Sequence, residues 1–248
     1  MSYQQEKFKE IADKIREKTG ITDKIKPSEF AGLQDDVFEA GKQAENKRFW
    51  DLYQEEGYKQ NYSNAFSGPS WTIELFKPRY DIKPTVAYMV FRASGLEGDL
   101  VEIAERLGIV IDFSSCTNLQ FTFLNSKLTR IGTVGGKFTT NLEQTFREAE
   151  MLHTIDKLIL KKENKIIRTF EGCTALENIT IEGTIGTSFD IHWSPLSKAS
   201  IESIVSALSD TVTEQTVTFN NERIDTIYTE SEWASVVATK PNWTFALL

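Results

Sequence analysis

The chain has 248 residues, with 28 Lys plus Arg against 36 Asp plus Glu and a net charge of -8. Its 40% hydrophobic and 26% charged residues are typical of a globular protein and exclude a disordered chain. The net negative charge argues against binding to nucleic acid, whose phosphates are also negative. No run approaches the roughly 18 consecutive apolar residues of a membrane span, and the first residues lack the apolar run of a signal peptide. We therefore expect synthesis in a host cytoplasm, without membrane insertion and without export by the ordinary signal.

The first 57 residues predict two helices. Apolar residues recur at helical spacing over 4–20, and Gly20 ends that pattern. Pro27 and Ser28 then mark the start of a longer helix over 28–56, which Gly57 ends. Strand-like sequence is nearly absent here, so these helices need a partner surface.

The longer predicted helix carries an apolar stripe with the alternating three-four spacing of a coiled coil. In one reading the stripe lies on its own chain, and in the other copies of it pack around a symmetry axis. We expect self-association, as a trimer, because residues 1–57 offer little covering surface of their own. The residues of the stripe are Phe30, Leu33, Val37, Ala40 and Ala44.

Beyond Gly57, short apolar runs alternate with Gly, Ser and Asn turns, and a unit of Phe, a small residue and Leu recurs. Successive phenylalanines are 32, 23 and 24 residues apart. Such a period is typical of stacked structural repeats, in which the large residue of each unit fills the core. The expected core anchors are Phe91, Phe123, Phe146, Leu152, Phe170 and Leu176.

One stretch of this region resembles a known repeat family. Residues 169–181 match the BspA-type leucine-rich repeat, Phe-x-x-Cys-x-x-Leu-x-x-Ile-x-Ile, at every anchor. In the other copies Ser94, Ser126 and Ala149 stand in place of the cysteine. The resemblance implies an irregular leucine-rich-repeat β-solenoid over 58–193.

A second resemblance covers the N-terminal part. Residues 11–20 and 24–30 are similar to a segment that recurs in tail and minor structural proteins of phages and prophages of Gram-positive bacteria. This resemblance implies a virion component, in the tail or baseplate.

The end of the chain reads as a cap. A last strand over 189–193 and a turn over 194–197 precede a short helix, a strand over 216–219, a helix through Ala238 and an edge strand at 241–245. The expected fold class is therefore α+β: an N-terminal helical, coiled-coil-like segment (1–57), a leucine-rich-repeat β-solenoid (58–193) and an α/β C-terminal cap (194–248).

The residues that could carry chemistry do not form a recognisable site. Cys116 and Cys173 are expected to be buried, reduced and too far apart to bridge. His153 and His192 have no further ligand at metal-binding spacing. Residues 133–137 lack the upstream glycine of a phosphate loop. We expect no catalytic residue, no metal and no cofactor.

Aromatic residues outside the repeat are candidates for surface contacts, because such rings stack on sugars or on neighbouring proteins. The alternative is that they cover the first turn of the repeat under the helix end. They are Trp50, Tyr53, Tyr58, Tyr62 and Trp71.

These observations lead to one expected function with two alternatives. The chain is expected to be a non-enzymatic structural and binding protein of a phage tail or baseplate, located in the virion. Its partners would be its own copies, other tail or baseplate proteins, and a bacterial cell-surface glycan or protein. The alternatives are a tail hydrolase of cell-envelope glycan, and a connector or fibre that never touches the host.

Overall fold

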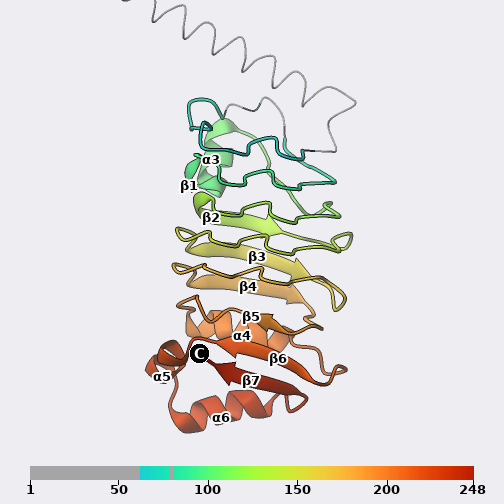
Figure 1. Cartoon of the computed structure of the whole chain (residues 1–248), viewed down its shortest axis with the longest axis vertical. Coiled ribbons are helices and arrows are strands. Elements are labelled where there is room, and N and C mark those ends of the chain that lie inside the picture. Colours follow the sequence, from blue (N-terminus) through green and yellow to red (C-terminus); the bar gives the residue numbers. More distant parts are fainter. Residues whose placement is uncertain (1–61, 77, 79–80) are drawn as a thin grey trace, which may run out of the picture. The chain divides into compact units, whose positions relative to one another are not determined.

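The computed structural model describes residues 62–76, 78 and 81–248, all within one compact unit of the chain (Figure 1). The helices and strands of the described part, in chain order, are β1 (Glu97–Asp99), α3 (Leu100–Leu107), β2 (Lys127–Val134), β3 (Thr154–Leu160), β4 (Asn178–Gly183), β5 (Phe189–Asp190), α4 (Lys198–Ala207), β6 (Gln215–Phe219), α5 (Asn221–Ile227), α6 (Glu230–Ala238) and β7 (Trp243–Leu247). The first sheet is formed by β1, β2, β3 and β4, in that spatial order.

Every strand pair of the first sheet is parallel. The register aligns like residues in neighbouring strands: Ile131 faces Ile155, which faces Ile179. All three are buried, with at most 3% of the residue exposed. Stacked β-branched side chains on the inner face therefore hold the sheet on the core.

A column of phenylalanine rings forms the centre of the core. The rings of Phe91, Phe123, Phe146 and Phe170 follow one another with centroids 5.6, 5.6 and 5.8 Å apart and interplanar angles of 4°, 7° and 18°. We call the stretch of chain from one of these rings to the next a row, and each ring thus contacts the ring of the next row. Burial and ring stacking both stabilise this arrangement.

The backbone around this column is also paired from row to row. The amide of Phe123 donates to the carbonyl of Thr145 (2.8 Å), and the amide of Phe146 donates to the carbonyl of Thr169 (3.1 Å). The buried hydroxyl of Thr145 donates to the carbonyl of Leu142 at 2.7 Å. The hydroxyl of Thr145 is therefore satisfied within the protein, whereas the buried hydroxyl of Ser126 has no hydrogen-bond partner among the described residues.

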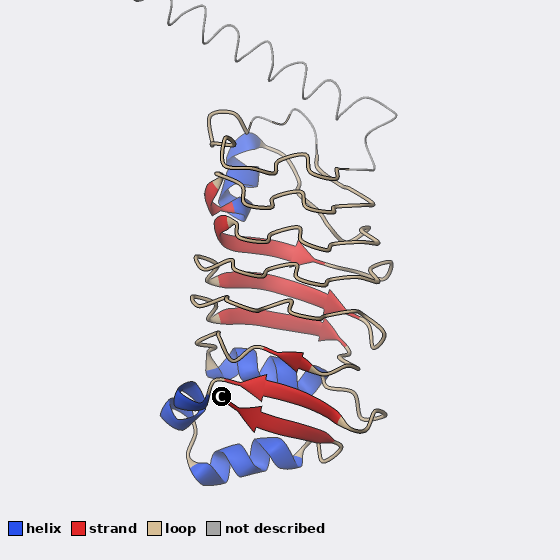
Figure 2. Cartoon of the chain, viewed as in Figure 1, coloured by secondary structure: helices blue, strands red, loops and turns tan. Residues whose placement is uncertain are grey.

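Helix α4 covers the edge of the first sheet. Ser197 caps its N-terminus, and the helix lies against β4 (Figure 2). The hydroxyl of Ser200 accepts the amide hydrogen of Ile179 (2.9 Å), and that of Ser203 accepts the amide hydrogen of Ile181 (2.8 Å). Two serines thus satisfy backbone donors that a further strand would otherwise take, which protects the edge.

The second sheet has the order β5-β6-β7, and its pairs are again parallel. The chain passes from β6 to β7 through α5 and α6. Trp233 on α6 packs edge-on against Phe219 (5.9 Å between centroids) and Phe245 (5.8 Å). A capping box of Thr229 and Glu232 fixes the start of α6.

The expected fold class is wrong. The described part is an α/β domain, with two parallel sheets and four helices, and not an α+β β-solenoid with a helical segment before it and a cap after it. The recurrence of Phe, a small residue and Leu did not predict helix α3. This helix lies inside the 32-residue interval between Phe91 and Phe123, which we interpreted as repeat sequence. The longest helix in this part has ten residues, and the helices expected over 4–20 and 28–56 lie outside it.

The described residues contain no helix that is both long enough and apolar enough to cross a membrane.

Candidate functional site

The chain makes a turn directly after each of the stacked phenylalanines, and these turns lie in neighbouring rows. Two residues after each ring stands Ala93, Asn125, Glu148 or Gly172, and each has a positive φ, of 47°, 49°, 57° and 74° respectively. The rows are linked by hydrogen bonds: the amide of Glu148, for example, donates to the carbonyl of Glu171 at 2.7 Å. These four positions, which we call the turn column, therefore lie in successive rows.

Trp193 stands in the row after Gly172. The hydroxyl of Ser194 donates to the carbonyl of Cys173 at 3.1 Å, which aligns the residue before Ser194 with the residue before Cys173. Trp193 is nevertheless 46% exposed, an unusual state for a ring of this size. Its ring lies 4.6 Å from that of His192, at an interplanar angle of 37°.

The backbone under Trp193 is held from two sides. The Oδ1 atom of Asp190 accepts the amide hydrogen of His192 (3.0 Å) and lies 2.6 Å from its Nδ1 atom. The carbonyl of His192 accepts a hydrogen bond from Nδ2 of Asn220 (2.9 Å), which is also the N-cap of α5. The exposed ring therefore stands on a fixed loop. We call Asp190, His192 and Trp193 the Trp193 site.

Carboxylates and guanidinium groups lie in the neighbouring rows. Glu171 bonds to Arg168 and to Arg147, whose Nε atom is 3.2 Å from Oε1. Hydrogen bonding from Arg168 is the main reason that the pKa of Glu171 is lowered, so this carboxylate stays ionised. Arg147 also contacts Glu148 at 2.8 Å. The arginines are thus already engaged by carboxylates.

A groove of about 270 Å³ lies between α3 and β2. Its lining is mainly apolar and includes Val101, Ala104 and Val110. Nearby, Arg130 bridges Asp156 (2.8 Å) and Asp99 (3.3 Å) across the outer face of the sheet. Those ion pairs link side chains of neighbouring strands, and nothing in the groove indicates an occupant.

The expected core anchors all lie inside the protein. None of them is more than 3% exposed. They are Phe91, Phe123, Phe146, Leu152, Phe170 and Leu176.

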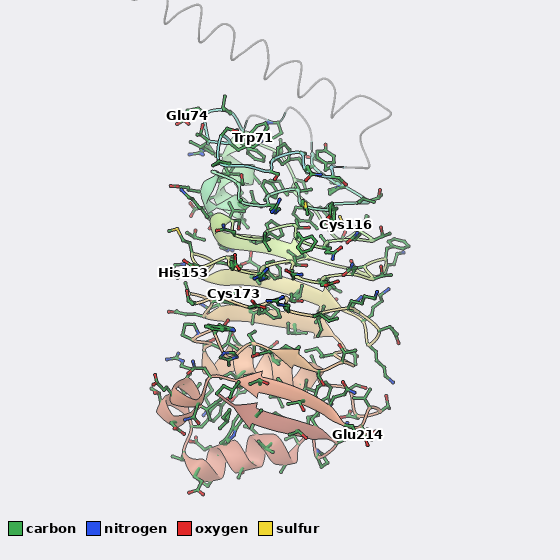
Figure 3. The ribbon with its side chains drawn as sticks, in the orientation of Figure 1. Trp71, Glu74, Cys116, His153, Cys173 and Glu214 are labelled. Carbon is green, nitrogen blue, oxygen red and sulfur yellow. The ribbon has the colours of Figure 1, made fainter. Side chains whose placement is uncertain are left out.

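The expected contact aromatics are not brought together. Tyr62 is only 2% exposed, with its ring 6.1 Å from that of Phe66, so it is an interior ring and no contact residue. Trp71 is half-buried and meets Phe66 edge-on at 5.3 Å; Figure 3 shows it at the end of the described part that carries α3. The remaining expected contact and self-association residues lie outside the described part: Trp50, Tyr53, Tyr58, Phe30, Leu33, Val37, Ala40 and Ala44.

Both cysteines are buried and free (Figure 3). The thiol of Cys116 donates to the carbonyl of Pro84, and that of Cys173 to the carbonyl of Phe146, each at 3.0 Å. Burial raises the pKa of both thiols to about 12. They are therefore protonated, inert groups at neutral pH.

The histidines differ in their surroundings. His153 contacts the carbonyl of Met151 through Nδ1 (2.8 Å), whereas His192 belongs to the Trp193 site. Among the residues that the structure places, no group of three or more His, Cys, Asp or Glu side chains could hold a metal ion.

Sequence reasoning missed the role of Trp193 because we took residues 189–193 as one strand. The strand ends at Asp190, and the chain then leaves the sheet. The available signal was Asp190 two residues before His192, since an aspartate in that position accepts the backbone amide and favours a turn.

Comparison with protein-family models, with curated proteins and with solved structures found no match to this chain.

Proposed function

We propose that the chain is a non-enzymatic structural and binding protein of a phage tail or baseplate, and that its α/β domain contacts the bacterial surface through the Trp193 site. The observation that carries the binding role is Trp193 itself, 46% exposed on a loop that Asp190 and Asn220 hold in place. The assignment to a phage particle depends on the resemblance of residues 11–20 and 24–30 to phage structural proteins.

The support beneath the site favours binding. A large exposed ring gains free energy when a partner covers it, and a partner gains more when the ring is already ordered, because less side-chain entropy is lost. The Trp193 loop follows β5, whose Phe189 pairs in parallel with Val217 of β6. The domain thus provides a pre-ordered contact.

Several copies of such a contact would act together. The apolar stripe that includes Phe30, Leu33 and Val37 has coiled-coil spacing, and we propose a homotrimer formed through it. Linked copies raise the overall strength of attachment about 10²- to 10⁴-fold without any new contact. Weak individual sites would then suffice.

In light scattering, a double change, Leu33→Asp with Val37→Asp, should lower the molecular mass to that of the monomer. An unchanged mass would rule out self-association through this apolar stripe.

The binding role is tested with labelled full-length protein on cells of the strain whose phage or prophage encodes the chain. The wild type should bind and should reduce adsorption of the particle. Trp193→Ala should lose most of this binding, whereas Phe138→Ala, which removes another ring that is 51% exposed, should keep it. Equal binding by both variants would refute the proposed contact.

A second assay separates binding from hydrolysis. Purified protein is incubated with cell-wall glycan, and new reducing ends are measured. We expect none above the level of heat-denatured protein, and a steady release of reducing ends would replace the binding role with glycan hydrolysis.

A further inference from the structure

We propose that a cleft between α4 and α6 binds a small zwitterion, an α-amino acid with an apolar side chain. The cleft has a volume of about 450 Å³, within the range of about 300 to 1,000 Å³ that is usual for small-molecule sites. It shares no residue with the Trp193 site, so this inference goes beyond the proposed function and does not depend on it. The lining includes Glu202, Val205, Ser206, Asp210, Val236 and Lys240.

Two lysine side chains link the walls of the cleft. Near the start of both helices, Nζ of Lys198 on α4 contacts Oε1 of Glu232 on α6 at 3.3 Å. Directly after α6, Nζ of Lys240 donates to the carbonyl of Leu208, the C-cap of α4, at 2.6 Å and to Oδ1 of Asp210 at 2.8 Å. The cleft lies between these two links. Its walls are therefore joined before a ligand arrives, which lowers the entropy cost of binding.

Lys240 provides a buried donor for a ligand carboxylate. The residue is only 9% exposed, and an ammonium group carries three N–H donors. Leu208 and Asp210 take two of these donors, and the third has no acceptor among the described residues. A buried donor without an acceptor costs free energy. An oxygen atom of a ligand in the cleft would remove that cost.

Glu202 provides the opposite charge for a ligand ammonium group. It is exposed on α4, and its carboxylate has no hydrogen bond or ion pair with any residue that the structure describes. Lys198, one helical turn earlier, is already engaged by Glu232. A ligand ammonium group would form a charge-assisted hydrogen bond with this carboxylate.

The remaining walls suit an apolar side chain. Val205 and Val236 line the cleft from opposite helices, and an apolar group placed against them is removed from water. An amine without a carboxylate would leave the donor of Lys240 unused. A carboxylate without an ammonium group would be repelled by Glu202 and Asp210. A zwitterion with an apolar side chain satisfies all three parts of the cleft.

The test uses the full-length protein with leucine and with two fragments of the same shape. The first fragment, 3-methylbutylamine, lacks the carboxylate of leucine, and the second, 4-methylpentanoate, lacks the ammonium group. Binding is measured by calorimetry and by saturation-transfer NMR. Leucine should bind with a Kd of about 1 mM or tighter, and each fragment should bind at least about threefold more weakly.

Variants then locate the site. Ser206→Trp introduces a large side chain at the cleft from an exposed position and should abolish binding of leucine. Glu202→Gln should weaken it at least about threefold, a modest change because the carboxylate is exposed. Glu163→Gln removes an exposed carboxylate outside the cleft and should leave the Kd unchanged, as should Trp193→Ala. Circular dichroism shows whether Ser206→Trp folds; if it does not, the comparison of Glu202→Gln with Glu163→Gln decides.

The inference is overturned if leucine does not bind at about 10 mM, or if either fragment binds as tightly as leucine. It is also overturned if Glu202→Gln binds leucine as tightly as Glu163→Gln does.

Discussion

Replacing Phe146 with alanine should be among the most damaging single changes in the described domain. The ring is fully buried and lies between two others, 5.6 Å from Phe123 and 5.8 Å from Phe170. Buried Phe→Ala changes cost about 3 to 5 kcal/mol through lost transfer free energy and the cavity that remains. Each stacked pair contributes a further 0.5 to 1.5 kcal/mol, roughly, which places Phe146→Ala in the upper half of that range.

Urea unfolding followed by circular dichroism measures this cost. Because domains are stable by only about 5 to 15 kcal/mol, the midpoint should fall strongly. Phe138→Ala is the matched control: the same side chain is removed from a position that is 51% exposed, and the cost should stay below about 1 kcal/mol. Similar midpoints for the two variants would refute the column of rings as the centre of the core.

Three further predictions concern polar groups. Thr145→Val should cost about 0.5 to 1.5 kcal/mol in urea unfolding, because one buried hydroxyl bond to the carbonyl of Leu142 is lost while Oγ1 of Thr169 and the amide of Thr145 still donate to that carbonyl; a loss of several kcal/mol would contradict this account. Arg130→Met should cost no more than about 1 kcal/mol by the same measurement, since its side chain is 41% exposed and such ion pairs are weak, and a loss of several kcal/mol would show that the bridge holds the sheet. Burial raises the pKa of the Cys116 and Cys173 thiols from 9.0 to about 12, so the unfolded chain loses these protons first and the free energy of unfolding should fall as pH rises from about 9 to 12. Replacing both cysteines with alanine should flatten that fall, and native protein should not react with a thiol reagent near pH 8, roughly, whereas rapid reaction would place the thiols at the surface.

Part of the fold could be predicted from the sequence. The phenylalanines 23 and 24 residues apart, Phe123, Phe146 and Phe170, are the rings that stack in successive rows, because a fixed chain length per row returns the same position to the same column. Helix α3 was not foreseen, although Asp99 accepts two amide hydrogens at its N-terminus and Gly108 ends it in the left-handed conformation. The strand pairing was not foreseen either, since short apolar runs separated by turns fit parallel and antiparallel neighbours alike.

The candidate site was less accessible to sequence reasoning than the core. Exposure of Trp193 depends on where β5 ends and on the bond from Asn220, a residue 27 positions further along the chain. The row next to the Trp193 loop is formed by residues that are 20 or more positions away in sequence. A local sequence pattern shows neither the bond from Asn220 nor the neighbours in the adjacent row. Tyr62 was a candidate for a surface contact, with a covered position as the alternative, and the structure buries it.

The most direct test of the proposed role is immunogold electron microscopy of particles from the strain that encodes the chain, with antibodies raised against the α/β domain. A tail or baseplate binding protein should place gold at the distal end of the tail, and an excess of free full-length protein should remove the label. Gold over the head, or particles that carry no label while the antibody detects the protein in the cell lysate, would contradict the proposed role.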